Sequence, residues 1–187
     1  NTPAVADPDS HSLLLQAAER ANSGDFAQAA ELSQQLLSRN GADVDALFLL
    51  GRSLAMLARN DEAITALEKA AKARPDAIEV LTLLGHLLFH SSRHEEAKDA
   101  FSRCLALNPN HIEAMRQMAN LTLGSDQAGA LLLFKQAFAL APDHADLLFD
   151  QAWAMTYSAG DTDAGATLFR RWLEFGGGNA DRGSIAL

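Results

Sequence analysis

Apolar side chains recur along this chain at intervals of three and four residues, the spacing that places them on one face of an α-helix. In the first such stretch the residues at this interval are Leu13, Leu14, Ala17, Ala18 and Ala21. Polar residues 22–25 interrupt the pattern, and a second helical stretch runs from Phe26 to about Arg39. The same order then returns along nearly the whole chain: helix, polar turn, helix, and a Pro or Gly. The pattern therefore predicts an all-α chain of helix pairs.

Three series of positions define the period of this repeat. The first small position is Ala17, Gly51, Gly85, Ala119 and Ala152. The second small position is Ala29, Ala63, Ala97, Ala130 and Ala164. The position that stops the second helix is Gly41, Pro75, Pro109, Pro142 and Gly176. Small side chains let paired helices approach closely, and Pro or Gly ends a helix.

Each series advances by 34 residues, apart from one step of 33 in the fourth unit. The missing residue falls in the turn at residues 124–126, where we expect a tighter turn or a shorter first helix. A fixed period of this length predicts an α-solenoid, in which each helix pair buries its apolar face against its neighbours.

The period also predicts the division of the chain. Residues 1–9 form a lead-in, and residues 177–187 form a Gly-rich tail or linker. The repeat domain covers residues 10–175, with units at about 10–43, 44–77, 78–111, 112–144 and 145–176. Trp172, Phe175 and the apolar end of the tail would be partly exposed. We therefore expect the chain to continue into another domain, or this end to meet a partner such as a second copy.

Acidic residues at the start of several predicted helices suggest capping. An N-cap acceptor three residues before a carboxylate is a variant of the capping box. The three pairs with this spacing are Asp76 and Glu79, Asn110 and Glu113, and Asp143 and Asp146. We interpret these acids as structural, since a negative charge in the first turn suits the helix dipole.

The composition restricts the classes of partner. A net charge of −9 and a pI near 5.0 argue against a nucleic-acid partner, because phosphate binding needs clustered cations. No apolar run approaches the roughly 18 residues of a membrane-spanning helix. The single cysteine, Cys104, excludes an internal disulfide. A cytoplasmic location is slightly favoured, and a periplasmic one would follow if Asn1 succeeds a cleaved signal peptide.

No pattern for catalysis or for a cofactor is present. Nucleophile motifs, phosphate-binding Gly-rich loops and the HExxH spacing are absent, so we expect no enzyme and no cofactor. His86 and His90 share one helix face and could chelate a metal, but His94 is expected in the turn and no third ligand is evident. We therefore predict no metal site.

The middle units carry the most complete form of the repeat. The second unit supplies Leu47, Leu50, Gly51, Leu54, Ala63, Leu67, Ala70 and Pro75. The third supplies Leu81, Leu84, Gly85, Leu88, Ala97, Phe101, Cys104 and Pro109. These residues closely resemble the tetratricopeptide repeat, a 34-residue helix–turn–helix. The fifth unit departs from it, with Arg171 where a small residue is expected.

The resemblance implies a right-handed superhelix of antiparallel helix pairs, whose first helices line a concave groove that holds a peptide or a partner's helix. Transferred by register, the groove residues are Phe48, Arg52, Thr82, His86, Phe89, His90, Arg116, Asn120, Phe149, Trp153 and Tyr157, with Met56 and Leu123 beside them. Aromatic rings with Arg and Asn donors are typical of binding surfaces. The lysines with which chaperone-binding members grip a terminal carboxylate are missing, since Leu14 and Ala18 stand there.

Two functions follow from this reading. The first is a non-catalytic interaction scaffold that binds a peptide or helix of a partner protein. The second is the N-terminal repeat region of a larger enzyme, such as a transferase, that presents substrate or mediates dimerisation. The Gly-rich tail favours the second.

Overall fold

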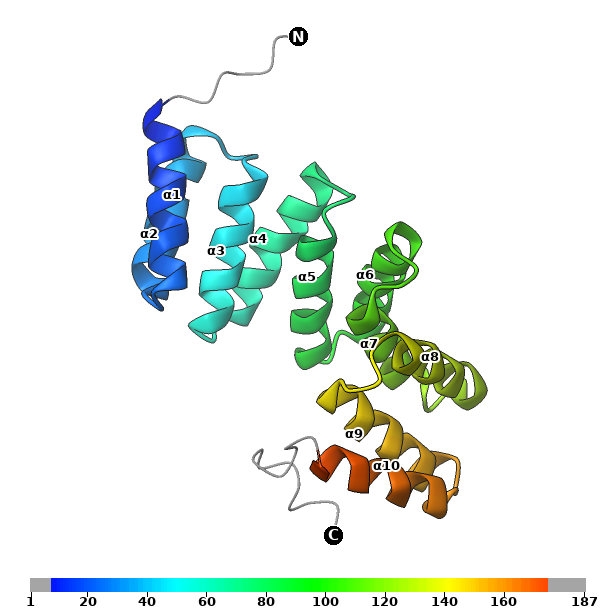
Figure 1. Ribbon diagram of the computed structural model, residues 1–187. Helices are drawn as coiled ribbons and strands as arrows, with labels where there is room; N and C mark the ends of the chain where they lie inside the picture. Colours follow the sequence, from blue (N-terminus) through cyan, green and yellow to red (C-terminus); the bar gives the residue numbers. More distant parts are fainter. Residues whose placement is uncertain (1–7, 175–187) are drawn as a thin grey trace. The chain divides into compact units, whose positions relative to one another are not determined.

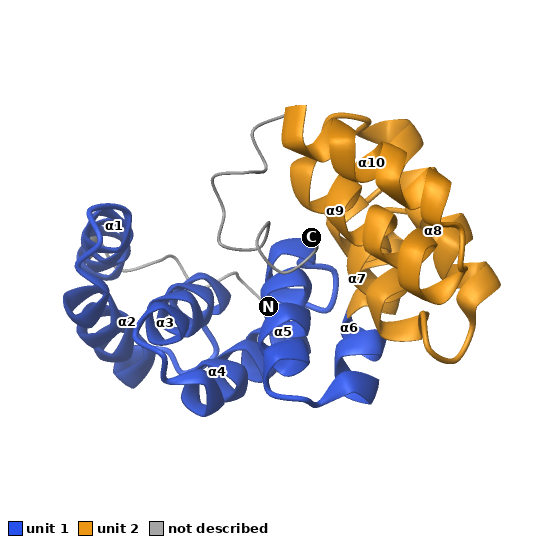
Figure 2. Ribbon diagram, turned by 90° about the horizontal axis from the view of Figure 1, so that it is seen from below, with its two compact units in different colours: residues 1–100 blue, residues 101–187 orange. Residues whose placement is uncertain are grey.

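A computed structural model describes residues 8–174, which contain ten α-helices and one π-helical segment and, within that range, no strand (Figure 1). This agrees with the predicted all-α class. The chain forms two compact units, residues 1–100 and 101–187 (Figure 2). No helix in the described range is long and apolar enough to cross a membrane.

The first unit alternates first and second helices of successive pairs. The helices are α1 (Pro8–Asn22), α2 (Phe26–Arg39), α3 (Val44–Met56), α4 (Asn60–Ala73), α5 (Ile78–His90) and the beginning of α6 (His94–Leu107). Helix α3 contacts both α1 and α5, so the first helices lie side by side, while α2 and α4 form the second layer (Figure 2). Helix α1 begins at Pro8, two residues before its predicted start, with proline in the first turn, where its missing N–H does no harm.

The repeated small residues hold each helix pair together. Ala17, Ala29 and Ala63 are completely buried. A Cβ atom added to Gly51 would lie 2.6 Å from Cγ of Leu67, which is itself fully buried on α4. The close approach of α3 and α4 therefore requires glycine at this position.

The turns inside the first three pairs share one conformation. Gly24, Ala58 and Ser92 each adopt a positive φ, of 84°, 59° and 60°. The next amide then donates to a carbonyl five residues earlier, as from Arg59 N to Leu54 O at 2.9 Å. The left-handed residue ends the first helix and directs the chain into the second.

The second unit contains two helix pairs and the remainder of α6. Its elements are α7 (Ile112–Thr122), α8 (Gln127–Leu140), α9 (Ala145–Trp153), the π-helix η1 (Ala154–Ser158) and α10 (Thr162–Glu174). Its core contains Met115, Ala119, Ala130, Phe134, Ala137, Leu147 and Ala154.

The deletion in the fourth unit shortens the end of α7, one of the two outcomes that the sequence predicted. Helix α7 has 11 residues, whereas α3 and α5 have 13. No residue between α7 and α8 has a positive φ, and Asp126 N donates to Thr122 O, only four residues earlier, at 2.7 Å. The left-handed residue of the other turns is the one that has been lost.

An insertion in the fifth unit corrects the predicted register. The π-helix after α9 accommodates one extra residue, so Asp161 N donates to Met155 O, six residues earlier. The buried small residue of α10 is consequently Gly165, and the predicted Ala164 is only half-buried. A Cβ atom at Gly165 would meet the Thr156 side chain and the Ala152 carbonyl.

The same shift corrects two further expectations for α10. The residue at the inner packing position is Trp172, which is buried, and the prediction that it would be partly exposed is wrong. Arg171, which seemed to occupy that position, instead reaches Asp143 at 3.1 Å and lies over the Phe138 ring. The predicted helix stop at Gly176, Phe175 and the Gly-rich tail lie outside the described residues, as does most of the lead-in.

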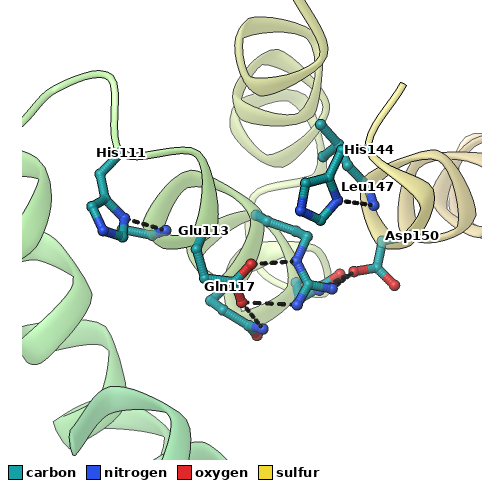
Figure 3. Close-up of polar contacts among 9 residues, drawn as sticks. His111, Glu113, Gln117, His144, Leu147 and Asp150 are labelled. Carbon is teal, nitrogen blue, oxygen red and sulfur yellow. Dashed lines mark hydrogen bonds and ion pairs between the residues drawn. The ribbon is translucent and has the colours of Figure 1, made fainter. Parts of the chain in front are cut away.

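The predicted N-caps Asp76, Asn110 and Asp143 are wrong by one residue. The N-caps of α5, α7 and α9 are Ala77, His111 and His144, because their carbonyls accept the first helical hydrogen bonds. Nδ1 of His111 accepts from Ala114 N at 3.1 Å, and Nδ1 of His144 accepts from Leu147 N at 3.4 Å (Figure 3). The Nδ1 atoms therefore serve as the capping acceptors at these helix ends.

Candidate functional site

The predicted groove residues lie on the first helices of their repeats or directly after them, and they are grouped here by unit. The unit 1 face consists of Phe48 and Arg52 on α3 and of Thr82, His86, Phe89 and His90 on α5. The unit 2 face consists of Arg116 and Asn120 on α7, Phe149 and Trp153 on α9, and Tyr157 in η1. All are half-buried except His90, Trp153 and Tyr157, which are exposed.

On the unit 1 face, polar and aromatic side chains interact across neighbouring helices and turns. Nη2 of Arg52 donates to Oδ1 of Asn22 at 3.4 Å, which joins α3 to α1. Phe89 lies edge-on to the His90 ring, with centroids 5.5 Å apart, and 5.6 Å from the His94 ring. Thr82 bonds to its own helix through Ile78 O. The histidines therefore contribute an aromatic cluster at the end of α5.

The structure also locates the histidines considered as metal ligands. His94 is the first residue of α6, whereas the sequence had placed it in the turn. Within residues 8–174, no group of three or more His, Cys, Asp or Glu side chains is arranged to hold a metal ion.

On the unit 2 face, Arg116 is the centre of an ion-pair network. Its Nε and Nη2 donate to both carboxylate oxygens of Glu113, at 2.9 and 2.8 Å. Its Nη1 donates to Oδ2 of Asp150 on α9 at 2.6 Å. Asn120 Nδ2 donates to the same oxygen at 2.9 Å, and Gln117 Nε2 donates to Glu113 at 2.9 Å (Figure 3). The network joins the first helices of two successive repeats.

The electrostatics of this network favour the charged form of Arg116. Burial lowers the pKa of Arg116, but the hydrogen bonds and charges of Glu113 and Asp150 outweigh burial and leave that pKa raised. A guanidinium that bridges two carboxylates is geometrically matched to them, since its planar fork donates two parallel bonds. Arg116 is thus a clamp between α7 and α9.

The three aromatic residues of the unit 2 face differ in their surroundings. Phe149 packs against Phe169 and Trp172 of α10, with ring centroids 5.7 and 5.2 Å apart. Trp153 and Tyr157 contact each other, with centroids 5.4 Å apart and planes tilted by 40°. Their exposed fractions are 44% and 59%. Phe149 therefore stabilises α9 against α10, while the other two rings face solvent.

Asp150 is a central residue of this network that the sequence did not predict. It accepts from both Arg116 and Asn120. It follows Arg116 by 34 residues, one period of the repeat, and this is the signal that could have identified the pair. Glu113, predicted as a capping carboxylate, instead holds the guanidinium.

The ten α-helices of residues 8–174, paired about small buried residues with a 34-residue period, define the class as a helical repeat scaffold. The tetratricopeptide repeat family matches residues 21–87 and again residues 78–111. These matches identify residues 21–111 as tetratricopeptide repeats, which form scaffolds used for protein–protein interaction. No curated protein matches the chain.

Solved structures of the same fold come from distantly related sequences. MamA residues 41 to the end from Desulfovibrio magneticus RS-1 is 16% identical, with a TM-score of 0.82, over 95% of this chain and 100% of that one. Another MamA crystal structure is 20% identical, with a TM-score of 0.78, over 89% and 91% of the two chains. YrrB, described as a TPR protein with an unusual peptide-binding site, is 18% identical, with a TM-score of 0.74, over 87% and 84%. At these identities the similarity establishes the fold.

Proposed function

We propose that the unit 1 and unit 2 faces bind an extended or helical segment of a partner protein, and that the chain is a non-catalytic interaction scaffold. One observation carries the proposal. Trp153 and Tyr157, both large aromatic residues, are exposed, and both stand at positions where the repeat would place a ligand contact. Exposed tryptophan and tyrosine are enriched at the centres of binding surfaces.

The pattern of burial along the first helices supports this function. Residues that recur in every repeat, such as Ala17 and Ala119, are completely buried and build the scaffold. Residues that change from repeat to repeat stand on the two faces, among them Arg52, His86 and Trp153. Changing side chains on a constant scaffold provide specificity, because repeat proteins share their packing and differ in the residues that meet the ligand.

Similarity of fold to YrrB adds support, because a scaffold of this kind can carry a peptide-binding site. The side chains of the two faces suggest a ligand with both apolar and polar groups. Phe48 and Phe89 offer apolar area, while His86, His90 and Arg52 offer donors. A peptide segment combines these properties in a short length.

The proposal is tested by selecting peptides from an unbiased random library against the intact chain. The best binder is then mapped by amide chemical-shift changes in NMR spectra. We expect the shifts to concentrate on α1, α3 and α5, or on α7 and α9. Shifts confined to α2, α4, α8 or α10, or a library that yields no binder, would contradict the proposed function.

A matched pair of variants separates the predicted face from the rest of the surface. Trp153→Ala removes an exposed ring from α9, and Leu132→Ala removes a comparable apolar group from α8, where Leu132 is 55% exposed. For a peptide mapped to α7 and α9, Trp153→Ala should weaken binding by at least about tenfold, as truncation of a central aromatic contact does. Leu132→Ala should leave the affinity unchanged, and the reverse result would place the site on the second helices.

A further inference from the structure

The exposed aromatic pair of unit 2 has no cationic residue near it in the sequence. Between Gln136 and Phe169 the chain contains five aspartates and neither lysine nor arginine. Arg116 pairs with Asp150, and Arg171 pairs with Asp143, so these two cations offset part of the charge. The segment that carries Trp153 and Tyr157 therefore keeps a net negative charge.

The backbone around the pair is built differently from the other repeats. Tyr157 belongs to η1, the π-helix that follows Trp153 directly. Thr156 Oγ1 donates to Ala152 O at 2.9 Å, and the glycine at position 165 leaves room for the threonine side chain. A π-helical turn is rare and is frequently found at functional sites. The departure from the repeat thus coincides with the exposed rings.

The chemistry of this surface favours one class of ligand group. The faces of indole and phenol rings carry negative electrostatic potential and attract ammonium and guanidinium groups. The net negative charge of the segment adds to this attraction and opposes an anionic ligand such as a nucleic acid or an acidic peptide. A wholly apolar ligand would bury the rings but would gain nothing from the aspartates.

We propose that Trp153 and Tyr157 form a subsite for a lysine or arginine side chain of the partner segment. This inference rests on the proposed function and gives the partner its chemistry: a basic segment whose cation lies against the two rings. Asp150 stays with Arg116 and serves to hold α9 in place, so the rings provide the direct contact.

The test uses two synthetic peptides, acetyl-(Gly-Arg-Ala)₄-amide and the same peptide with citrulline in place of arginine. Citrulline keeps the size and planar shape of the arginine head group but carries no charge, because a carbonyl oxygen replaces one of the terminal nitrogens. The intact ¹⁵N-labelled chain reports binding through its two indole N–H resonances, since Trp153 is exposed and Trp172 is buried. We expect the arginine peptide to shift the Trp153 resonance, to leave that of Trp172 unchanged, and to bind about tenfold more tightly than the citrulline peptide, as a desolvated cation–π contact predicts.

Variants of the two rings provide the control. Trp153→Leu and Tyr157→Leu keep apolar area and remove the ring, so each should abolish most of the preference for arginine over citrulline. Tyr157→Phe keeps the ring and should retain the preference. Unchanged helicity by circular dichroism shows that a variant is folded.

Three results would overturn the inference. Equal affinities for the two peptides would show that charge is not recognised, and a Trp153 resonance unmoved by either peptide would place no ligand on the rings. A Trp153 resonance that moves with protein concentration alone would make a second copy of the chain the occupant. In each case library-selected peptides that still map to α7 and α9 would leave the proposed function standing.

Discussion

Replacement of Arg116 by methionine decides whether this residue is a clamp or a ligand contact. The sequence placed Arg116 in the groove, whereas its guanidinium already bonds to Glu113 and Asp150. Methionine keeps much of the aliphatic volume and removes the charge and all five donors. The variant therefore leaves two carboxylates close together without their cation.

The expected loss follows from the burial of the three side chains. Arg116 is 12% exposed, Asp150 16% and Glu113 25%. Exposed pairs contribute about 0.2–1 kcal/mol. Removal of one partner from a buried pair costs about 3–5 kcal/mol. An incompletely buried network should lie between these limits, so we expect Arg116→Met to lower the free energy of unfolding by about 2–3 kcal/mol, or Tm by about 5–10 °C.

Urea and thermal denaturation measure the loss in the free energy of unfolding. A double-mutant cycle shows how much of that loss comes from the contact between Arg116 and Asp150. The cycle combines Arg116→Met with Asp150→Asn, and the coupling should be about 1–2 kcal/mol if the bond between α7 and α9 is the source. Arg74→Met is the matched control, because Arg74 pairs with Asp45 at 3.2 Å while both side chains are about half exposed. That control should cost less than about 1 kcal/mol.

An Arg116→Met variant as stable as the parent chain would refute this reasoning. Such a result would mean that water already solvates the carboxylates. It would return Arg116 to the set of residues available to a ligand.

Three further substitutions test the packing of single residues. Gly51→Ala should lower the free energy of unfolding, measured in urea, by about 1–3 kcal/mol, because the new Cβ would lie 2.6 Å from Leu67 Cγ. In an unhindered helix the same substitution would stabilise by about 1 kcal/mol. Any gain in stability would therefore contradict the close approach of the two helices. Gly165→Ala should lower the free energy of unfolding by a similar amount and increase amide hydrogen exchange in α10, because its Cβ would meet Thr156. Unchanged exchange would argue against the shifted register of α10. Ser53→Ala should raise Tm or leave it unchanged, because Ser53 Oγ is buried without a hydrogen-bond partner, and a loss above about 1 kcal/mol would show that the hydroxyl is satisfied.

The period of small residues was sufficient to predict the scaffold. Ala17, Gly51, Ala119 and Ala152 are buried where the repeat predicted, and the deletion near residue 124 shortens the first helix of the fourth unit, one of the two expected outcomes. These features depend on local spacing, which the sequence displays directly. The fold could therefore be predicted with the helix boundaries correct to within about two residues.

The wrong predictions concern the register of α10 and the N-caps of three helices, where two neighbouring residues both fit the sequence pattern. Ala164 and Gly165 are equally small, so spacing could not reveal the extra residue in η1, and only the backbone shows that Gly165 is buried. At the N-caps, Asn110 satisfied the capping pattern, but α7 begins at Ile112 and the His111 ring caps it.

Long-range pairing was also beyond the sequence analysis. Arg116 and Asp150 meet because stacking places equivalent parts of successive first helices side by side. Whether a polar residue on such a helix faces a ligand or its neighbour depends on that stacking. The two faces therefore remain a prediction from register, to which the structure adds the contacts of each residue.

The two irregular repeats determine how this chain can be recombined. The buried small residues of the second helices advance by 33 residues from Ala97 to Ala130 and by 35 from Ala130 to Gly165, so Ala97 and Gly165 are two whole periods apart. A chimera that exchanges both irregular repeats together for two regular ones keeps every later helix in phase. Exchanging only one of them by counting 34 residues would rotate the following helix by about 100°, one residue of an α-helix, and turn its buried stripe away from its partner. In this part of the array the fourth and fifth repeats should therefore be exchanged as a pair.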